Sequence, residues 1–408
     1  MVGICPLSNP IRDYAWGSHS AIAEFLGQPV PSPQPQAELW MGAHPGDPSR
    51  VRCGDRWVCL TELLREDPEG VLGAAVAARF DGRLPFLFKV LAADRPLSIQ
   101  AHPDREQARN GFERENAAGI AVDSAKRNYR DPYSKPELIC ALTPFSALRG
   151  FRAVPAIIEG FRALQVDAFA EEVAALERTP GARGLEDFLS ALLVAEREQV
   201  ARAVAQAVRS SASGPEDPAA QWVAALAAQY PEDAGTLAPL FLNLVALAPG
   251  EAMYLDSGEL HSYLEGVGIE IMANSDNVLR GGLTDKHVDV LELRRVLRFE
   301  SQEAPILQAR EVAAGERVFD TPADEFDLAV LTVGEGAPWR SATSRGVEIL
   351  LLVEGELTIA DCGKGETVGL KRGGSVLIPD SVERYELSGR GVVYRAGVPQ
   401  TRPSEHGQ

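Results

Sequence analysis

Short apolar runs separated by turn residues dominate the first 150 residues of the chain. The clearest runs, each bounded by Pro, Gly or Asp, are LPFLFKVL (84–91), LSIQAH (97–102) and ELICAL (137–142). Runs of this length with such boundaries are typical of β-strands. A helix is expected over 104–117, because Asp104 follows a proline and can cap the segment REQARNGFEREN. We therefore expect this region to be mostly strands and turns.

The pattern changes between residues 151 and 240. Here apolar residues recur at intervals of three and four, as in GLEDFLSALLVAEREQVARAVAQAVRS, and Ala, Leu, Glu and Arg dominate. This spacing and these residue types are typical of amphipathic helices. The segments RTPGARG and SSASGPEDP interrupt the pattern and have the composition of loops. Residues 151–240 are therefore predicted to form a helical insertion.

Strand-like runs return after residue 240, and two of them resemble each other. PGEAMYLDSGELHSYL (249–264) and GGSVLIPDSVERYEL (373–387) share a Gly turn, an apolar strand, an Asp-Ser turn and a second strand. His261 lies in the first copy, whereas the second copy has only Glu383, Arg384 and Tyr385 there. The repeat indicates a double β-barrel with an all-α subdomain. We assign residues 1–150 with 241–300 to a catalytic β domain and 301–408 to a C-terminal β domain without metal ligands.

Composition and charge exclude several classes of function. A net charge of −18 argues against a nucleic-acid surface, which needs a basic face. No apolar run is long enough to span a membrane. The first residues lack the basic start and long apolar stretch of a signal peptide, so a cytoplasmic protein is expected. The five cysteines are scattered and form no C-x-x-C pair, so any metal would need oxygen and imidazole ligands.

Four polar residues in strand-like segments are candidate metal ligands. Gln100 and His102 are two positions apart and would point to the same face of a strand. Both His102 and His261 are expected to close an apolar strand at a turn, and Glu137 begins another apolar strand. The alternatives are a polar strand face and an exposed glutamate at a strand end. A donor set without sulfur suits zinc, or manganese and cobalt in its place. His19 and His44 lie in loop-like contexts, where turn or surface residues are expected.

A second polar region is GIEIMANSDNVLRGGLTDKHVDV (268–290). It combines an Asn-Ser-Asp-Asn loop with Arg280, two glycines and Lys286. Glycines beside an arginine would let both backbone and guanidinium approach a ligand closely. The loop is therefore typical of a pocket for a sugar phosphate. The alternative is a charged surface loop.

Five longer motifs resemble the type I mannose-6-phosphate isomerase family. They are YAWGS, AELWMGAHPGDPS, LPFLFKVLAADRPLSIQAHPD, NYRDPYSKPELICALTPFSALRGFR and GIEIMANSDNVLRGGLTDKHVDV, which extend from residue 10 to about 299. The resemblance implies a cupin-like (jelly-roll) scaffold and zinc-dependent interconversion of D-mannose 6-phosphate and D-fructose 6-phosphate. It places the zinc ligands on Gln100, His102, Glu137 and His261 and the catalytic arginine on Arg280. Pocket-lining positions of the family match Ser98, Lys89, Lys135, Glu270 and Lys286.

The implied reaction moves one proton between C1 and C2 through an enediol(ate). Arg280 would stabilise the enediolate charge, and Lys135 or Glu270 would carry the proton. Ser98, Lys89 and Lys286 would bind the substrate. Ser134 stands where the family commonly has histidine, so the role of that histidine does not transfer to this chain.

One zinc ion per chain, a small sugar-phosphate substrate, no nucleic acid, no membrane and a monomer are expected. Two alternatives remain open at this point. The chain could be a non-catalytic metal-binding sensor of sugar phosphates, because a double β-barrel also suits that function. It could also be an isomerase for another aldose phosphate, since that selectivity depends on pocket shape.

Overall fold

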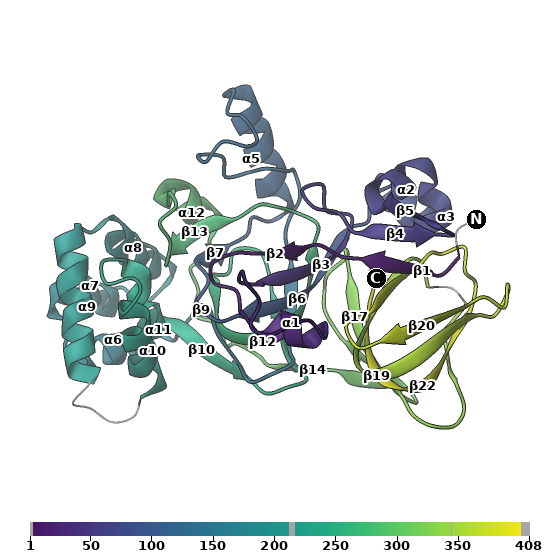
Figure 1. Ribbon diagram of the computed structural model, residues 1–408. Helices are drawn as coiled ribbons and strands as arrows, with labels where there is room; N and C mark the ends of the chain where they lie inside the picture. The colour runs from purple at the N-terminus through teal and green to yellow at the C-terminus, as the bar shows by residue number, and fades with distance from the viewer. Residues whose placement is uncertain (1–2, 212–216, 344, 401–408) are drawn as a thin grey trace, which may run out of the picture.

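The computed structural model describes residues 3–211, 217–343 and 345–400 and shows a mainly β protein with the helices of residues 154–241 gathered at one end (Figure 1). This confirms the expected class. All the strands of the described residues, β1 to β22, belong to two sheets of eleven strands each. Among the described residues, no helix is both long and apolar enough to cross a lipid bilayer.

The first sheet contains the candidate ligands. Its main strand order is β14-β11-β8-β12-β6-β3-β2, and β7, β9, β10 and β13 join it at the side. The strands are β2 (Ile11–Arg12), β3 (Glu38–Gly42), β6 (Phe86–Ala93), β7 (Ile99–Ala101), β8 (Glu137–Ala141), β9 (Phe145–Phe151), β10 (Leu242–Leu247), β11 (Glu251–Leu255), β12 (His261–Ala273), β13 (Leu279–Gly282) and β14 (Leu307–Gln308). The three apolar runs around residues 84–142 thus form β6, β7 and β8, as predicted.

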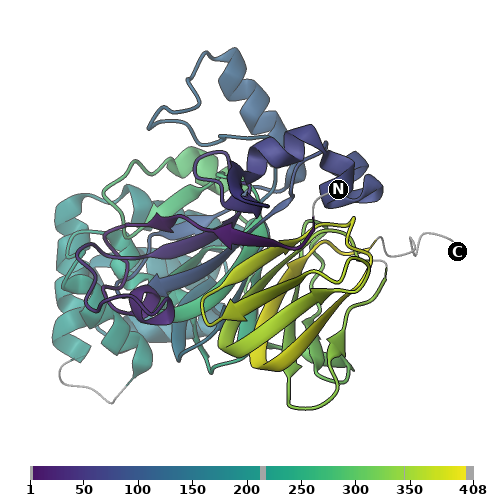
Figure 2. The same ribbon diagram turned by 45° about the vertical axis from the view of Figure 1, so that its right-hand side comes forward.

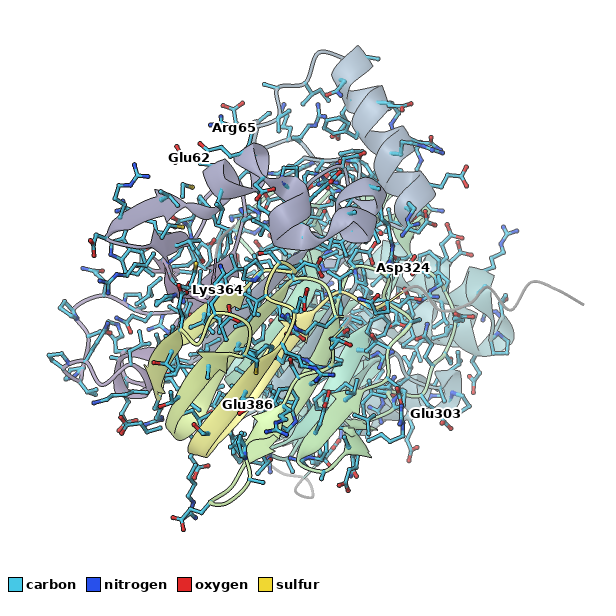
Figure 3. The ribbon with its side chains drawn as sticks, turned by 90° about the vertical axis from the view of Figure 1, so that its right-hand side faces the viewer. Glu62, Arg65, Glu303, Asp324, Lys364 and Glu386 are labelled. Atoms are coloured by element: carbon cyan, nitrogen blue, oxygen red, sulfur yellow. The ribbon has the colours of Figure 1, made fainter. Side chains whose placement is uncertain are left out.

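The second sheet combines the C-terminal strands with three strands from the N-terminal region (Figure 2). It contains β1 (Cys5–Ser8), β4 (Arg50–Cys53), β5 (Arg56–Cys59), β15 (Arg310–Ala313), β16 (Glu316–Phe319), β17 (Asp327–Val333), β18 (Trp339–Arg340), β19 (Glu348–Asp361), β20 (Thr367–Lys371), β21 (Ser375–Ile378) and β22 (Tyr385–Gly397). Cys5 on β1 lies opposite Leu377 on β21. Sheet membership therefore does not follow the linear ranges 1–150 and 301–408. Figure 3 faces this end of the molecule, where Lys364 and Asp324 are among the exposed charged residues.

The segment after residue 153 is helical, in agreement with the predicted insertion. Its elements are α6 (Val154–Ala163), η1 (Asp167–Phe169), α7 (Ala170–Arg178), α8 (Ala182–Val194), α9 (Arg197–Ser211), α10 (Pro218–Ala227), η2 (Ala234–Leu237) and α11 (Ala238–Phe241). Their buried faces share one apolar cluster with Ile99 and Ala101, the two neighbours of Gln100 on β7. Because side chains alternate along a strand, Gln100 points away from the helices.

The predicted helix over 104–117 is present as α5 (Arg105–Ala117). The side chain of Asp104 accepts the backbone N–H of Gln107, and the side-chain oxygen of Gln107 accepts the backbone N–H of Asp104. These two hydrogen bonds form a capping box. The other short helices were not predicted: α1 (Ala21–Phe25), α2 (Leu60–Glu66), α3 (Pro68–Leu72), α4 (Ala74–Arg79) and α12 (Val290–Val296). Each has at most seven residues, so its apolar period is too short to be told from that of a strand.

The alternation along β6 shows which face of the first sheet is polar. Phe86, Phe88 and Val90 lie in an apolar cluster with Ile349 and Leu377 of the second sheet. Lys89 lies between them in sequence and therefore points to the opposite face. The same alternation places Glu137 on β8 and Glu270 on β12 on that opposite face, since Leu138, Cys140, Ile269 and Ile271 belong to the cluster between the sheets. The first sheet thus collects its charged side chains on the face away from the second sheet.

Candidate metal centre and active site

Three buried side chains converge on one point of the first sheet. His102, Glu137 and His261 each offer a ligand atom, and these atoms lie within 4.8 Å of one another. His102 Nε2 is 3.3 Å from Glu137 Oε1, and His261 Nε2 is 3.6 Å from Glu137 Oε2. His102 follows β7, and Glu137 is the first residue of β8. His261 opens β12 instead of closing the preceding strand, which corrects the position predicted from sequence.

Backbone carbonyls fix the tautomer of both imidazoles. His102 Nδ1 lies 2.7 Å from the oxygen of Asn277, and His261 Nδ1 lies 3.0 Å from the oxygen of Glu259. Because a carbonyl only accepts, each Nδ1 carries the proton, and each Nε2 presents a lone pair to the carboxylate of Glu137. Burial lowers the pKa of His102 and lowers that of His261 to about 4, so both rings are neutral at neutral pH.

This arrangement fits a metal cation. The buried Nε2 of His102 has no hydrogen-bond partner among the described residues. Buried polar atoms without a partner are costly, and lone pairs that face carboxylate oxygens repel one another. A divalent cation at their centre would satisfy all three groups. Two imidazole nitrogens with oxygen donors are a set that zinc accepts.

Gln100 is placed to supply a fourth donor. On β7 it lies opposite His261 of β12 and opposite Arg280 of β13 in the backbone register. Its amide nitrogen donates to the hydroxyl of Ser98 at 3.3 Å. The carbonyl oxygen of the same amide is then left for the metal. A donor on the far side of the amide fixes its orientation, as outer-shell partners of metal ligands do.

Lys135 makes a second contact with the central carboxylate. Its ammonium is 3.0 Å from Glu137 Oε1, and its side chain is buried. Burial alone would raise the pKa of Glu137, but the charge of Lys135 outweighs it and holds this pKa well below its usual range. Glu137 is therefore ionised and available as a ligand.

Lys89 and Glu270 form a buried ion pair next to this centre. Lys89 Nζ is 2.7 Å from Glu270 Oε2 and 3.3 Å from Glu38 Oε1. The indole of Trp40 donates to the other oxygen of Glu38 at 2.7 Å. Burial raises the pKa of Glu270, whereas the two carboxylates raise that of Lys89 despite its burial. One ammonium thus serves two carboxylates.

Arg130, Arg280 and Lys286 are close enough to affect one another electrostatically, and we call them the unpaired cation group. Burial lowers the pKa of Arg280, and the charge of Arg130 lowers it further. Burial, Arg280 and Arg130 lower the pKa of Lys286 in the same way. Neither Arg280 nor Lys286 takes part in an ion pair within the described parts of the chain. Cations that repel one another beside a metal site suit an anionic ligand.

The glycines after Arg280 lie at close contacts with other parts of the protein. Gly282 has a φ of +136°, and a Cβ there would lie 2.9 Å from the Cα of Gly235 in η2. A Cβ on Gly281 would lie 3.1 Å from Leu260. These glycines therefore allow close packing of β13 against the helical insertion and against Leu260.

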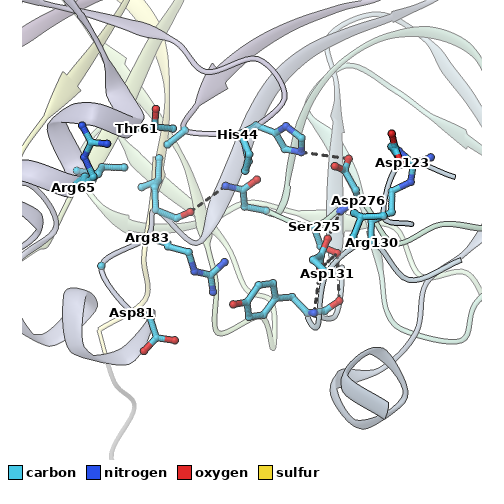
Figure 4. A pocket seen from close by; sticks show the side chains of 18 residues that line it. His44, Thr61, Arg65, Asp81, Arg83, Asp123, Arg130, Asp131, Ser275 and Asp276 are labelled. Carbon is cyan, nitrogen blue, oxygen red and sulfur yellow. Dashed lines mark hydrogen bonds and ion pairs between the residues drawn. The ribbon is translucent and has the colours of Figure 1, made fainter. Parts of the chain in front are cut away.

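A cavity of about 750 Å³ borders the loop that precedes Arg280 (Figure 4). Asp276, Arg130, Tyr133, Arg83 and His44 are among the residues that line it. His44 Nε2 lies 3.3 Å from Asp276 Oδ1, and this imidazole is buried. The expectation that His44 is a turn or surface residue is therefore wrong with respect to its exposure.

Sequence reasoning missed three residues near the site: Arg130, Asp276 and Asn277. Arg130 lies in the motif NYRDPYSKPE, five residues before Lys135, and Asp276 and Asn277 belong to the loop that was identified as polar. The motif and the loop were thus available as signals. The particular residues could not be selected, because their contacts join segments more than 140 residues apart.

Comparisons with known proteins find phosphomannose isomerases. Residues 4–154 match the family model described as phosphomannose isomerase type I, catalytic domain. The chain is 42% identical over 394 residues to mannose-6-phosphate isomerase of Escherichia coli (strain K12), covering 95% of this chain and 98% of that protein. It is 34% identical to the Homo sapiens protein of the same name, covering 92% and 93%. A crystal structure of the Salmonella typhimurium enzyme bound to fructose 6-phosphate and zinc has a TM-score of 0.91, 38% identity, and coverage of 98% and 100%.

Proposed function

The chain belongs to the type I phosphomannose isomerase family, and we propose that it interconverts D-mannose 6-phosphate and D-fructose 6-phosphate with one zinc ion per chain. The proposed zinc ligands are Gln100, His102, Glu137 and His261. The observation that carries the proposal is the convergence of two imidazole nitrogens, each with its lone pair towards Glu137, on the carboxylate of that residue. A Salmonella relative of 38% identity was crystallised with zinc and fructose 6-phosphate.

The reaction needs a stable place for negative charge while a proton moves between C1 and C2. A bound zinc ion supplies positive charge that stabilises an enediolate. Arg280 adds a second cation on the same side, because its strand position lies opposite Gln100. Its planar guanidinium can donate two parallel hydrogen bonds to adjacent oxygens, which a lysine cannot do.

Lys135 and Glu270 are the groups that we propose for proton transfer. Burial raises the pKa of Glu270, which brings a carboxylate closer to the range in which it can both take and release a proton. Its contact with Lys89 limits its freedom to move. Lys135 lies against the ligand Glu137 and is therefore at the metal centre itself. Lys135→Met and Glu270→Gln, each assayed at saturating zinc, would identify the group that governs kcat.

Substrate binding is assigned to Lys286, Ser98 and Lys89. Lys286 belongs to the unpaired cation group and suits the phosphate. The Ser98 hydroxyl oxygen accepts a hydrogen bond from the amide of Gln100, so Ser98 lies beside the proposed metal ligands. Lys89 is buried between Glu270 and Glu38, so it would affect substrate binding indirectly, by fixing the orientation of Glu270.

The test of function is a coupled assay of mannose 6-phosphate conversion to fructose 6-phosphate. Glucose 6-phosphate and ribose 5-phosphate serve as control sugars, because an isomerase for another aldose phosphate would prefer one of them. Activity on mannose 6-phosphate that disappears on chelation and returns with zinc supports the proposal. Preference for either control sugar would refute the substrate, and full activity of zinc-free protein would refute the role of the metal.

We further propose that the chain acts in the cytoplasm as a monomer, on a free sugar phosphate and without nucleic acid. All five cysteines are free thiols, which suits a reducing compartment. Gel filtration with light scattering measures the oligomeric state, and a stable dimer at micromolar concentration would contradict the proposal.

A further inference from the structure

The side chain of Asn277 joins two loops in the interior of the protein. It is 0% exposed. Its Oδ1 accepts the backbone N–H groups of Arg130, at 2.7 Å, and Asp131, at 3.3 Å. Its Nδ2 donates to the backbone oxygens of Asp131 and Tyr133, both at 2.8 Å. An amide offers one acceptor oxygen and two N–H donors, and Asn277 uses all of them.

Other contacts strengthen the same junction. The carboxylate of Asp131 accepts the hydroxyl of Ser275 at 2.8 Å and the backbone N–H of Asp276 at 2.7 Å (Figure 4). The Ser275 hydroxyl oxygen in turn accepts the backbone N–H of Asn277 at 3.2 Å. Residues 130–133 and 275–277 are therefore held together by several hydrogen bonds, with Asn277 and Asp131 making most of them.

The two loops lead directly to the reacting groups. Residues 130–133 precede Lys135 and Glu137, and residues 275–277 precede Arg280 on β13. The backbone oxygen of Asn277 is the group that accepts the Nδ1 proton of His102 at 2.7 Å. Asn277 thus contacts the proposed ligand His102 through its backbone oxygen and the loop before Lys135 through its side chain. It also lies shortly before β13, the strand that carries Arg280.

We propose that Asn277 is a positioning residue for this centre, an inference that rests on the proposed function. It acts through His102, because the side-chain hydrogen bonds hold the backbone carbonyl that keeps the imidazole in one tautomer and orientation. The same hydrogen bonds hold the loop that carries Lys135. Outer-shell partners that orient a metal ligand typically change metal affinity by about 10- to 100-fold when they are removed. A purely structural asparagine would change stability alone.

The decisive variant is Asn277→Asp, which keeps the size and one acceptor oxygen. The second carboxylate oxygen of the aspartate would stand where the amide nitrogen of Asn277 donates to oxygens of Asp131 and Tyr133. Oxygen would then face oxygen, so the two loops should separate. We expect the zinc dissociation constant, measured by competition with a chromophoric chelator, to rise about 10- to 100-fold. We also expect kcat at saturating zinc to fall, while near-ultraviolet circular dichroism shows a folded protein.

The matched control is Asn9→Asp. Asn9 also bridges two segments, since it donates to the hydroxyl of Ser375 at 2.7 Å and accepts that of Ser49 at 2.8 Å. These partners lie near the second sheet, so Asn9→Asp should lower the melting temperature and leave the zinc dissociation constant unchanged. If Asn277→Asp lowers the melting temperature but keeps zinc affinity and kcat within about twofold of wild type, the positioning role is refuted, since that is below the range of outer-shell effects.

Should Asn277→Asp fail to fold, Ser275→Ala provides a milder test. It removes the hydrogen bonds of this hydroxyl to Asp131, Tyr133 and Asn277 and leaves the side chain of Asn277 in place. A measurable rise in the zinc dissociation constant supports the proposal, and an unchanged constant overturns it. The zinc measurement needs no substrate. Wild-type protein that binds zinc tightly but does not isomerise mannose 6-phosphate would therefore refute the proposed function and leave the role of Asn277 to be decided by zinc affinity.

Discussion

Lys89 and Glu270 lie directly opposite each other on β6 and β12, with 2.7 Å between Nζ and Oε2. Both side chains are buried on the polar face of the first sheet, where Glu38 shares the same ammonium. Without Lys89, two carboxylates would share a dry environment with no cation of their own. The ion pair with Lys89 therefore allows the carboxylate of Glu270 to be buried at this site.

Lys89→Met should destabilise the protein strongly, by about 3 to 5 kcal/mol, because it leaves buried charge without a partner. The double variant Lys89→Met/Glu270→Gln should regain part of the lost free energy of unfolding, since one of the two carboxylates left without Lys89 is then replaced by a neutral amide. Urea denaturation of the two single variants and the double variant measures the coupling. Arg162→Met is the control, because the Arg162–Glu177 pair is exposed and its loss should change little. Equal effects of Lys89→Met and Arg162→Met would contradict the expectation.

Removal of zinc should abolish activity and also lower the melting temperature. Without zinc, the lone pairs of His102 and His261 face the carboxylate of Glu137 with no metal ion between them, and the folded state loses the stabilisation that metal binding gives it. Metal analysis before and after dialysis against a chelator, with scanning calorimetry, tests this. His102→Ala should reduce the zinc content to well below one ion per chain. A zinc-free protein with unchanged activity would show that the three residues are not a metal centre.

Arg280→Ala should lower kcat by about 100-fold or more and raise KM much less, if its guanidinium stabilises charge that develops in the transition state. Zinc content should not change. A rise in KM with a normal kcat would instead identify Arg280 as a phosphate ligand. Arg280→Lys separates these roles further, because a point charge can replace a phosphate contact but not a planar two-donor contact.

Asp327 should make stability depend on pH between about 4 and 6. Burial raises the pKa of Asp327 from 3.8 to about 6, and Arg395 only partly offsets this. In this interval the folded state holds a proton that the unfolded state has released. The stability that this proton contributes is therefore complete below pH 3.8 and is lost as pH rises through about 6.

Asp327→Asn removes this dependence, because the amide stays neutral at every pH. The variant should exceed wild type in free energy of unfolding at pH 7.5, on the order of 1 kcal/mol, and the difference should shrink towards pH 4.5. Urea titrations of both proteins at several pH values give the comparison. A difference that is constant with pH would show that Asp327 ionises normally in the folded protein.

The sequence predicted the parts of the fold that depend on local pattern. The runs that became β6, β7 and β8 were bounded by turn residues, and α5 had both partners of its capping box. The helical insertion was recognisable from residues such as Leu185, Phe188, Leu189 and Leu192, which recur at helical spacing and are all buried. Pattern and packing agree at these positions.

Long-range pairing could not be predicted in the same way. Nothing in the segment around Cys5 shows that it pairs with Leu377, and the short helices α2, α3 and α4 have too few turns to display a period. Gln100, His102 and Glu137 were found because long motifs contain them, whereas His261 was found from its place in a strand-like run outside those motifs. The contacts of Asn277 with Asp131, by contrast, depend on how two loops meet in space.

The pairing of β1 with β21 also affects the order in which the chain can fold during translation. Residues 5–8 pair with β4 on one side, but their other edge waits for residues 375–378. Until about 370 further residues have left the ribosome, that edge presents free N–H and C=O groups. Premature termination before residue 375 would thus leave the N-terminal strand open to pairing with other chains. In the cell, chaperones would be needed earliest at this N-terminal edge, long before the metal ligands are in place.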